Sequence, residues 1–137
     1  MNKKLTIAII DDDIIFHFIF SKLMEKLQVA NEVLIFSDGK EAIDFINSNI
    51  NNLDKLPDII FLDINMPVMN GWQFLDRYKL LEMKKKIMIY IVSSSNNPDD
   101  IIDAKAILEV SDYLVKPIKA EQYADIIDSF NKTNLDL

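Results

Sequence analysis

Four short apolar runs, each ending on a polar or charged side chain, constrain the fold of this chain more than any other feature. The runs and the residues that follow them are Ile7–Ile10 before Asp11-Asp12-Asp13, Ile59–Leu62 before Asp63, Ile87–Val92 before Ser93, and Tyr113–Val115 before Lys116. Short apolar runs that alternate with helical patterns are typical of buried parallel strands. In open α/β sheets, ligands bind at the carboxyl ends of the strands. We therefore expect Asp63, Ser93 and Lys116 to lie with the acidic cluster at one edge of a sheet.

The spacing of apolar residues predicts an α/β fold, a doubly wound five-stranded parallel sheet of the flavodoxin-like (βα)5 type. The expected strands are residues 5–10, 33–36, 59–62, 87–92 and 113–115. The expected helices run from Asp12 or Asp13 to about 27, over 40–49, over 72–82, from Pro98 to about 109, and over 119–130. On the first helix, one apolar stripe should face the sheet. Its members are Phe16, Ile19, Phe20, Leu23 and Leu27.

Length, charge and composition exclude several classes of function. The 137 residues predict a single domain, 1–137, and the stretch after Lys116 is too short for an output domain. A net charge of −7 argues against nucleic-acid binding, which needs a basic face. No apolar stretch approaches the roughly 20 residues that span a bilayer, so no membrane association is expected. Without cysteine or a signal-peptide pattern, the expected location is cytoplasmic.

Asp11, Asp12 and Asp63 together predict a Mg²⁺ site. An acidic helix start alone is an ordinary feature, because carboxylates there complement the helix dipole. Asp63, however, should end a neighbouring strand, and three adjacent carboxylates repel one another unless a cation compensates them. Mg²⁺ prefers oxygen ligands and keeps several of its waters, so a few carboxylates are enough to hold it.

Asp63 is the candidate nucleophile of this site. A carboxylate can attack phosphorus to give an aspartyl phosphate, and such a transfer depends on positioning and charge neutralisation. Lys116 offers a positive charge for that purpose and Ser93 a hydroxyl donor. Ser94 and Ser95 could also supply the hydroxyl, but Ser93 is preferred because it directly follows the apolar run.

In these features the chain resembles, over essentially its whole length, the receiver domains of two-component response regulators. The resemblance rests on Asp11-Asp12, Asp63, Met66-Pro67, Gly71, Ser93, Tyr113 and Lys116-Pro117. It implies a stand-alone receiver whose Asp63 accepts a phosphoryl group from a histidine kinase or a histidine phosphotransfer protein. It also implies that Asp12, Asp63 and the backbone carbonyl of Asn65 bind Mg²⁺, with Asp11 acting through water.

The resemblance further implies a switch around the phosphoryl group. Lys116 and Ser93 would hold its oxygens, and the Lys116–Pro117 peptide bond would be cis. The Ser93 hydroxyl would move toward the added charge and the Tyr113 ring would rotate inward. That motion would repack the face of the fourth helix, fifth strand and fifth helix for an unknown downstream protein. An aromatic ring at Tyr113 is also what an ordinary half-buried strand position prefers.

Ile15 and Phe18 are unusually apolar for the outer side of a helix that buries one stripe. Exposed apolar patches usually mark partner sites, so we expect both residues to form the docking surface for the kinase or phosphotransfer protein. His17, the only histidine, is expected to be an ordinary surface or boundary residue.

Two other functions share parts of this pattern. A phosphohydrolase of the haloacid dehalogenase type also uses an aspartate nucleophile and Mg²⁺. Such enzymes carry a second aspartate two residues on, where this chain has Asn65, which cannot act as a general acid. A receiver-like binding module that is never phosphorylated is the other alternative, and the complete set of acidic, hydroxyl and lysine residues argues against it. A signalling domain rather than an enzyme is the preferred interpretation.

Overall fold

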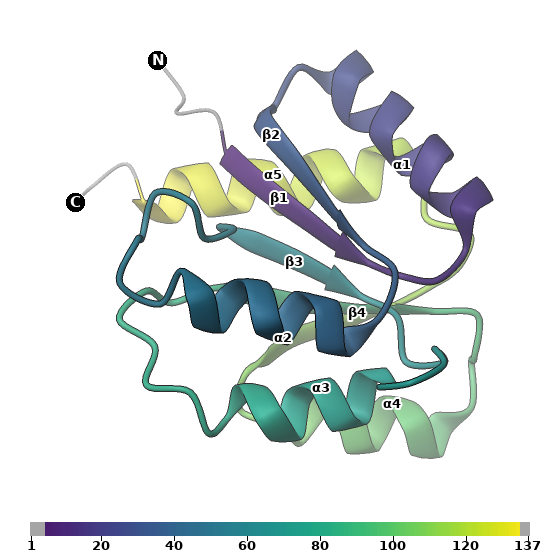
Figure 1. Cartoon of the computed structure of the whole chain (residues 1–137). Coiled ribbons are helices and arrows are strands. Elements are labelled where there is room, and N and C mark those ends of the chain that lie inside the picture. Colours follow the sequence, from purple (N-terminus) through teal and green to yellow (C-terminus); the bar gives the residue numbers. More distant parts are fainter. Residues whose placement is uncertain (1–4, 135–137) are drawn as a thin grey trace.

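The computed structural model describes residues 5–134 and shows a single parallel sheet between two layers of helices (Figure 1). In chain order the elements are β1 Leu5–Ile10, α1 Ile14–Leu27, β2 Ala30–Phe36, α2 Gly39–Ser48, β3 Ile59–Leu62, α3 Gly71–Tyr78, β4 Met88–Ser93, α4 Pro98–Lys105, β5 Val110–Val115 and α5 Ala120–Asn134. The five strands lie in the order β2-β1-β3-β4-β5, and every pairing is parallel. The predicted fold class is confirmed.

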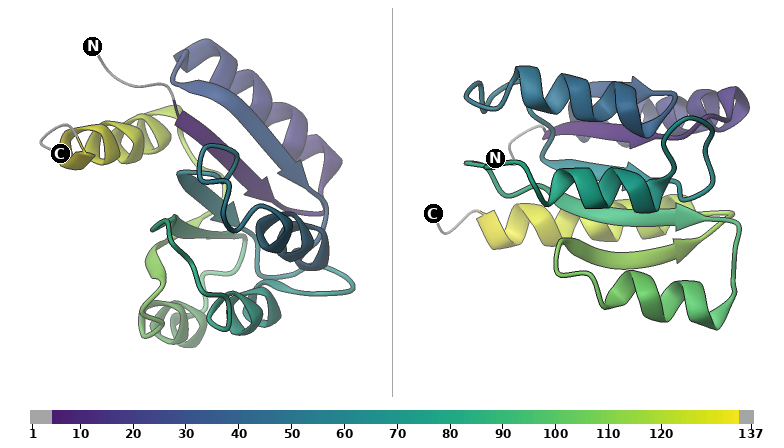
Figure 2. Two further views of the ribbon diagram at one scale, coloured as in Figure 1. Left: turned by 60° about the vertical axis from the view of Figure 1, so that its left-hand side comes forward. Right: turned by 60° about the horizontal axis from the view of Figure 1, so that its bottom comes forward.

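Alternate side chains along the strands face two separate hydrophobic cores. Helices α1 and α5 cover one face of the sheet, and α2, α3 and α4 cover the other (Figure 2). The first core includes Ile7, Ile9, Phe20, Phe61, Tyr123 and Ile127. The second core includes Ile10, Ile46, Leu62, Phe74, Ile91 and Ala104. Because both faces are buried, β1 and β3 read as continuous apolar runs in the sequence.

Helix α1 is rotated so that Phe20 and Met24 lie fully against the sheet. The expectation that Ile19 faces the sheet is wrong, because its side chain is 49% exposed. Successive residues of an α-helix are turned by about 100°, so Ile19 and Phe20 cannot both lie at the centre of the buried side. The remaining members of the predicted stripe, Phe16, Leu23 and Leu27, are partly buried against the core.

Several element ends differ from the sequence-based expectations. Helix α4 ends at Lys105 rather than near residue 109, and α3 ends at Tyr78 rather than near 82. Strand β5 begins at Val110, and its pairing with β4 skips Ser111, which leaves one extra residue in the strand. Within residues 5–134, no helix combines the length and apolar character needed to cross a membrane.

Candidate functional site

The pairing of β1 with β3 places Asp11 beside Asp63. Ile10 and Leu62 are register partners, so each aspartate is the first residue after a paired position. The backbone N–H of Asp63 donates to the carbonyl of Ile10 at 2.8 Å, which ties the two strand ends together. The arrowheads of β1 and β3 point to the same edge of the sheet in Figure 1. The site is therefore built on rigid strand ends.

Asp11, Asp12 and Asp63 form a cluster in which one carboxylate oxygen of each lies within 4.8 Å of the others. Asp11 and Asp63 are buried, at 1% and 8% exposure, whereas Asp12 is exposed to solvent. Three oxygen donors, one of them open to water, suit a small hard cation that keeps part of its hydration shell. The donor set therefore fits Mg²⁺.

Burial raises the pKa of Asp63 to about 6, and the neighbouring Asp11 carboxylate adds to the shift. The positive charge of Lys116 and hydrogen bonds from the backbone N–H groups of Asn65 and Ile64 act in the opposite direction. At neutral pH the Asp63 carboxylate is thus ionised in most molecules, but in an unfavourable environment that a cation would improve.

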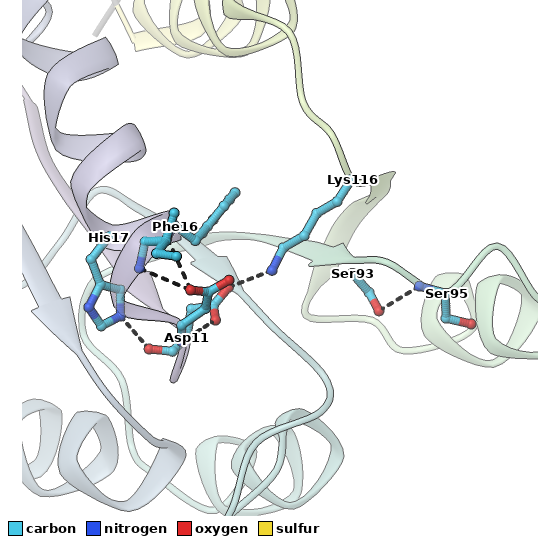
Figure 3. A network of polar contacts seen from close by, with 8 residues as sticks. Asp11, Phe16, His17, Ser93, Ser95 and Lys116 are labelled. Atoms are coloured by element: carbon cyan, nitrogen blue, oxygen red, sulfur yellow. Dashed lines mark hydrogen bonds and ion pairs between the residues drawn. The ribbon is translucent and has the colours of Figure 1, made fainter.

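Lys116 reaches the acidic cluster from the end of β5. Its Nζ lies 2.7 Å from Oδ2 of Asp11, and Figure 3 shows the side chain extended toward that carboxylate. The Lys116 backbone N–H donates to the carbonyl of Ser93 at 2.8 Å, and this bond fixes the end of β5 against β4. The Lys116–Pro117 peptide bond is cis, as the sequence resemblance implied.

Ser93, the last residue of β4, is fully buried. Its Oγ accepts a hydrogen bond from the Ser95 backbone N–H at 3.1 Å (Figure 3). The Tyr113 ring is buried at 7% exposure, and its hydroxyl donates to the Ser95 carbonyl at 2.7 Å. Ser95 Oγ in turn donates to Asp100 of α4 at 2.7 Å. Both groups to which the family resemblance assigned a switch thus contact the backbone of one residue.

The loop after Asp63 depends on Gly71. A Cβ atom at this position would lie 2.5 Å from the Asp63 carbonyl oxygen and 2.8 Å from the Ile64 Cα, so only glycine fits without a backbone shift. The Gly71 N–H donates to the Ile64 carbonyl at 2.8 Å. Asn65 follows Asp63 in this loop and is exposed. The glycine therefore holds α3 close to the acidic cluster.

Two residues of α1 contact the site in ways that the sequence did not reveal. The Phe16 ring centroid lies 4.1 Å from Lys116 Nζ, although Phe16 was predicted only to face the sheet. His17 Nε2 hydrogen bonds with the carbonyl of Asp11, and the ring is partly buried, as expected of a boundary residue. The Phe16 contact joins residues a hundred positions apart, so no local sequence signal could have indicated it.

The outer side of α1 presents a large apolar surface. It consists of Ile14, Ile15, Phe18 and Ile19, with exposures of 78%, 71%, 64% and 49%. We call these four residues the α1 apolar surface. Ile15 and Phe18 are exposed as the sequence predicted, and Ile14 and Ile19 extend the same surface.

Comparison with known proteins agrees with this geometry. A family model described as the response regulator receiver domain matches residues 7–128. The chain belongs to this receiver family. It is therefore a receiver domain of two-component signalling, and domains of this family generally act in signalling rather than as catalysts.

Relatives of this receiver domain align along most of its length. Two-component response regulator 24 of Arabidopsis thaliana is 28% identical over 129 residues, which cover 93% of this chain and 85% of that protein. A two-component response regulator from Cytophaga hutchinsonii superimposes with a TM-score of 0.83 at 30% identity, covering 93% of this chain and 98% of that one. The receiver domain of a sensor histidine kinase from Pseudomonas aeruginosa shares the fold, with a TM-score of 0.77 at 18% identity and coverage of 95% and 99%; its structure has a magnesium ion coordinated in the active site cleft.

Proposed function

We propose that this receiver domain accepts a phosphoryl group on Asp63, in the presence of Mg²⁺, from a histidine kinase or a histidine phosphotransfer protein. The observation that carries the proposal is the meeting of three carboxylates, at the carboxyl ends of β1 and β3, with the Lys116 ammonium, which reaches them from the end of β5. An ordinary sheet edge gains nothing from burying two carboxylates side by side, because each raises the energy of the other's charge. At a site that binds a metal ion, the cation offsets the repulsion between the carboxylates, and the ion can then interact with a phosphoryl group.

In the proposed transfer, a carboxylate oxygen of Asp63 attacks the phosphorus of the donor phosphohistidine. The new O–P bond forms as the P–N bond breaks, and the electron pair of that bond returns to the imidazole. Lys116 would neutralise charge on the phosphoryl oxygens, and the Ser93 hydroxyl would donate to one of them. The pKa of about 6 leaves Asp63 ionised, and hence nucleophilic, at neutral pH.

Asp12, Asp63 and the Asn65 backbone carbonyl would hold the Mg²⁺, with Asp11 acting through a water molecule. When bound, the ion supplies charge neutralisation between the carboxylate and the incoming phosphoryl oxygens. The exposed position of Asp12 leaves one side of the cluster open to water, which suits an ion that keeps part of its hydration shell. The magnesium ion in the P. aeruginosa receiver supports this assignment by analogy of fold.

The Ser95 backbone offers a route from the phosphoryl group to a partner-binding face. Movement of the Ser93 hydroxyl toward Asp63 would release the backbone N–H of Ser95. The backbone carbonyl of the same residue accepts the hydrogen bond from the Tyr113 hydroxyl. The Tyr113 ring and the start of α4 would then adjust together, changing the face made by α4, β5 and α5. In physical terms, one added charge biases a two-state element that a downstream protein reads.

The α1 apolar surface is the proposed docking site for the phosphoryl donor. Four large apolar side chains exposed on adjoining turns are too many for a face that meets only water. The surface begins one residue after Asp13, the N-cap of α1, so a donor seated on it would lie close to the acidic cluster.

The proposed function is tested by incubating the protein with Mg²⁺ and acetyl phosphate and measuring the intact mass. One added phosphoryl group in the parent protein, absent in Asp63→Asn, supports the proposal. A parent protein that binds Mg²⁺ but gains no phosphoryl mass contradicts it, and favours the unphosphorylated binding module.

A further inference from the structure

The Lys116 ammonium has two partners of different kinds. One is the Asp11 carboxylate, with Nζ 2.7 Å from Oδ2, and the other is the face of the Phe16 ring, with Nζ 4.1 Å from the centroid. The lysine side chain is 20% exposed, so both contacts form in a place that is largely shielded from water. A cation over an aromatic face within about 6 Å is attracted by the ring quadrupole, and the attraction grows as water is excluded.

A lysine at this position needs such a partner because its side chain is long and flexible. Four rotatable bonds give lysine a large conformational entropy, and its ammonium is a point charge without the fixed geometry of an arginine. The ion pair with Asp11 restricts the ammonium on one side only. Phe16 belongs to α1, which is fixed against the sheet by Phe20 and Met24. The Phe16 ring is therefore held in place and limits the movement of the Lys116 ammonium on a second side.

We propose that Phe16 is a positioning residue for Lys116, whose ring keeps the ammonium beside Asp11 and Asp63 where it can meet an incoming phosphoryl group. The inference rests on the proposed phosphoryl transfer and adds to it a residue that neither the sequence pattern nor the family resemblance assigned. Phe16 also packs partly against the core, so its positioning role has to be separated from a purely structural one.

Two substitutions make that separation. Phe16→Leu keeps an apolar side chain but removes the ring, whereas Phe16→Tyr keeps a ring of the same shape. A structural role predicts similar behaviour from both variants wherever both fold well. A positioning role predicts that Phe16→Tyr resembles the parent protein and Phe16→Leu does not.

The first measurement needs no phosphorylation. A methylene group beside an aromatic face has NMR shifts displaced by the ring current, so the ε-methylene protons of Lys116 should be displaced upfield in the parent protein and in Phe16→Tyr. They should return toward ordinary lysine values in Phe16→Leu. Unchanged Lys116 shifts in Phe16→Leu would overturn the proposal.

The second measurement is the rate of phosphoryl acceptance from acetyl phosphate at saturating Mg²⁺. A lost cation–π contact corresponds to a slowing of about threefold to thirtyfold in Phe16→Leu, and Phe16→Tyr should stay close to the parent rate. In a Lys116→Met background, Phe16→Leu should have no further effect, because the partner of the ring is already gone. Equal slowing in both backgrounds would overturn the proposal. A parent protein that accepts no phosphoryl group contradicts the proposed function instead, and the Lys116 shifts then still test whether the Phe16 ring contacts the lysine.

Discussion

Asp63 lies where its charge is unfavourable to the fold. Burial and the Asp11 carboxylate both raise its pKa, to about 6, against an ordinary value of 3.8. Between these two pH values the folded protein binds more protons than the unfolded chain, so the free energy of unfolding falls as pH rises through this window. At pH values above this window, the free energy of unfolding is lower by the full amount of this effect. The residue proposed to react is therefore one that the folded protein would be more stable without.

Asp63→Asn should accordingly stabilise the protein at pH 7.5. The expected gain is up to roughly 3 kcal/mol in the free energy of unfolding, following from the raised pKa of Asp63. Urea unfolding in the presence of a chelator should show this gain at pH 7.5 and little gain at pH 3.5, where the aspartate is protonated in the folded protein and mostly protonated in the unfolded chain. Equal stabilities of variant and parent at pH 7.5 would contradict a raised pKa of Asp63 in the folded protein.

Single residues differ in how far the sequence could predict their place. Asp63, Ser93 and Lys116 each follow a short apolar run, and parallel pairing brings the ends of such runs to one edge of the sheet. The burial of Ile19 was predicted wrongly because the rotation of α1 depends on which side chains fit the sheet, and Met24 fits there. The contact of Phe16 with Lys116 depends on the same rotation of α1, so the sequence could not predict this contact either.

Among the elements, the loop that leads into β4 is fixed by one lysine. Lys85 Nζ lies 3.0 Å from the Asp58 carboxylate and also donates to the carbonyls of Leu53 and Leu56, at 3.0 and 2.9 Å. The side chains of Lys85 and Asp58 are only 19% and 10% exposed. Removing one partner of a buried, hydrogen-bonded ion pair leaves the other without compensation. The ion pair thus joins the segment before β3 to the segment before β4.

Lys85→Met should lower the free energy of unfolding by about 3 kcal/mol, measured by urea unfolding at neutral pH. Lys40→Met is the matched control, because Lys40 forms a 2.8 Å ion pair with Asp44 on the exposed surface of α2. Pairs of that kind add little to stability, so the control should unfold much as the parent does. Similar effects of the two substitutions would show that burial does not distinguish the two pairs.

The α1 apolar surface leads to a prediction about donor selection. Ile15→Ser and Phe18→Ser should slow phosphoryl transfer from a cognate kinase, because both remove apolar area from the proposed docking site. Labelling by acetyl phosphate should be preserved, since a small donor needs no docking surface. Leu80→Ser is the control, because Leu80 is at least as exposed as Ile15 and Phe18, at 78%, but lies beyond the end of α3. Equal losses with kinase and small donor would refute the docking role.

Element boundaries show a second limit of the sequence. Helix α4 was expected to reach residue 109, because Ala106 to Glu109 carry no glycine, proline or asparagine to stop it. It ends at Lys105, and Val110 already pairs with Ile89 in the sheet. The helix end is thus set by the strand that must follow, a long-range requirement that local propensity does not contain.

For the whole molecule, the proposed Mg²⁺ site predicts that stability depends on the ion. An ion that binds only the folded state adds about 2.7 kcal/mol to the free energy of unfolding at a concentration 100 times its Kd. Mg²⁺ should therefore raise the unfolding midpoint of the parent protein, and a chelator should reverse the change. Asp12→Asn should lose this response with little change in the metal-free protein, because Asp12 is exposed. A full Mg²⁺ response in Asp12→Asn would exclude Asp12 as a ligand.

The ion pair between Asp11 and Lys116 spans 105 positions of the sequence. A ribosome completes Asp11, Asp12 and Asp63 before it reaches the lysine, and β5, which carries the lysine at its end, pairs with β4 at the edge of the sheet. A chain still in synthesis therefore has the acidic side chains without their cation. In the proposed transfer, such a chain would lack the ammonium that neutralises the phosphoryl oxygens, so we expect it to accept a phosphoryl group poorly until β5 has joined the sheet.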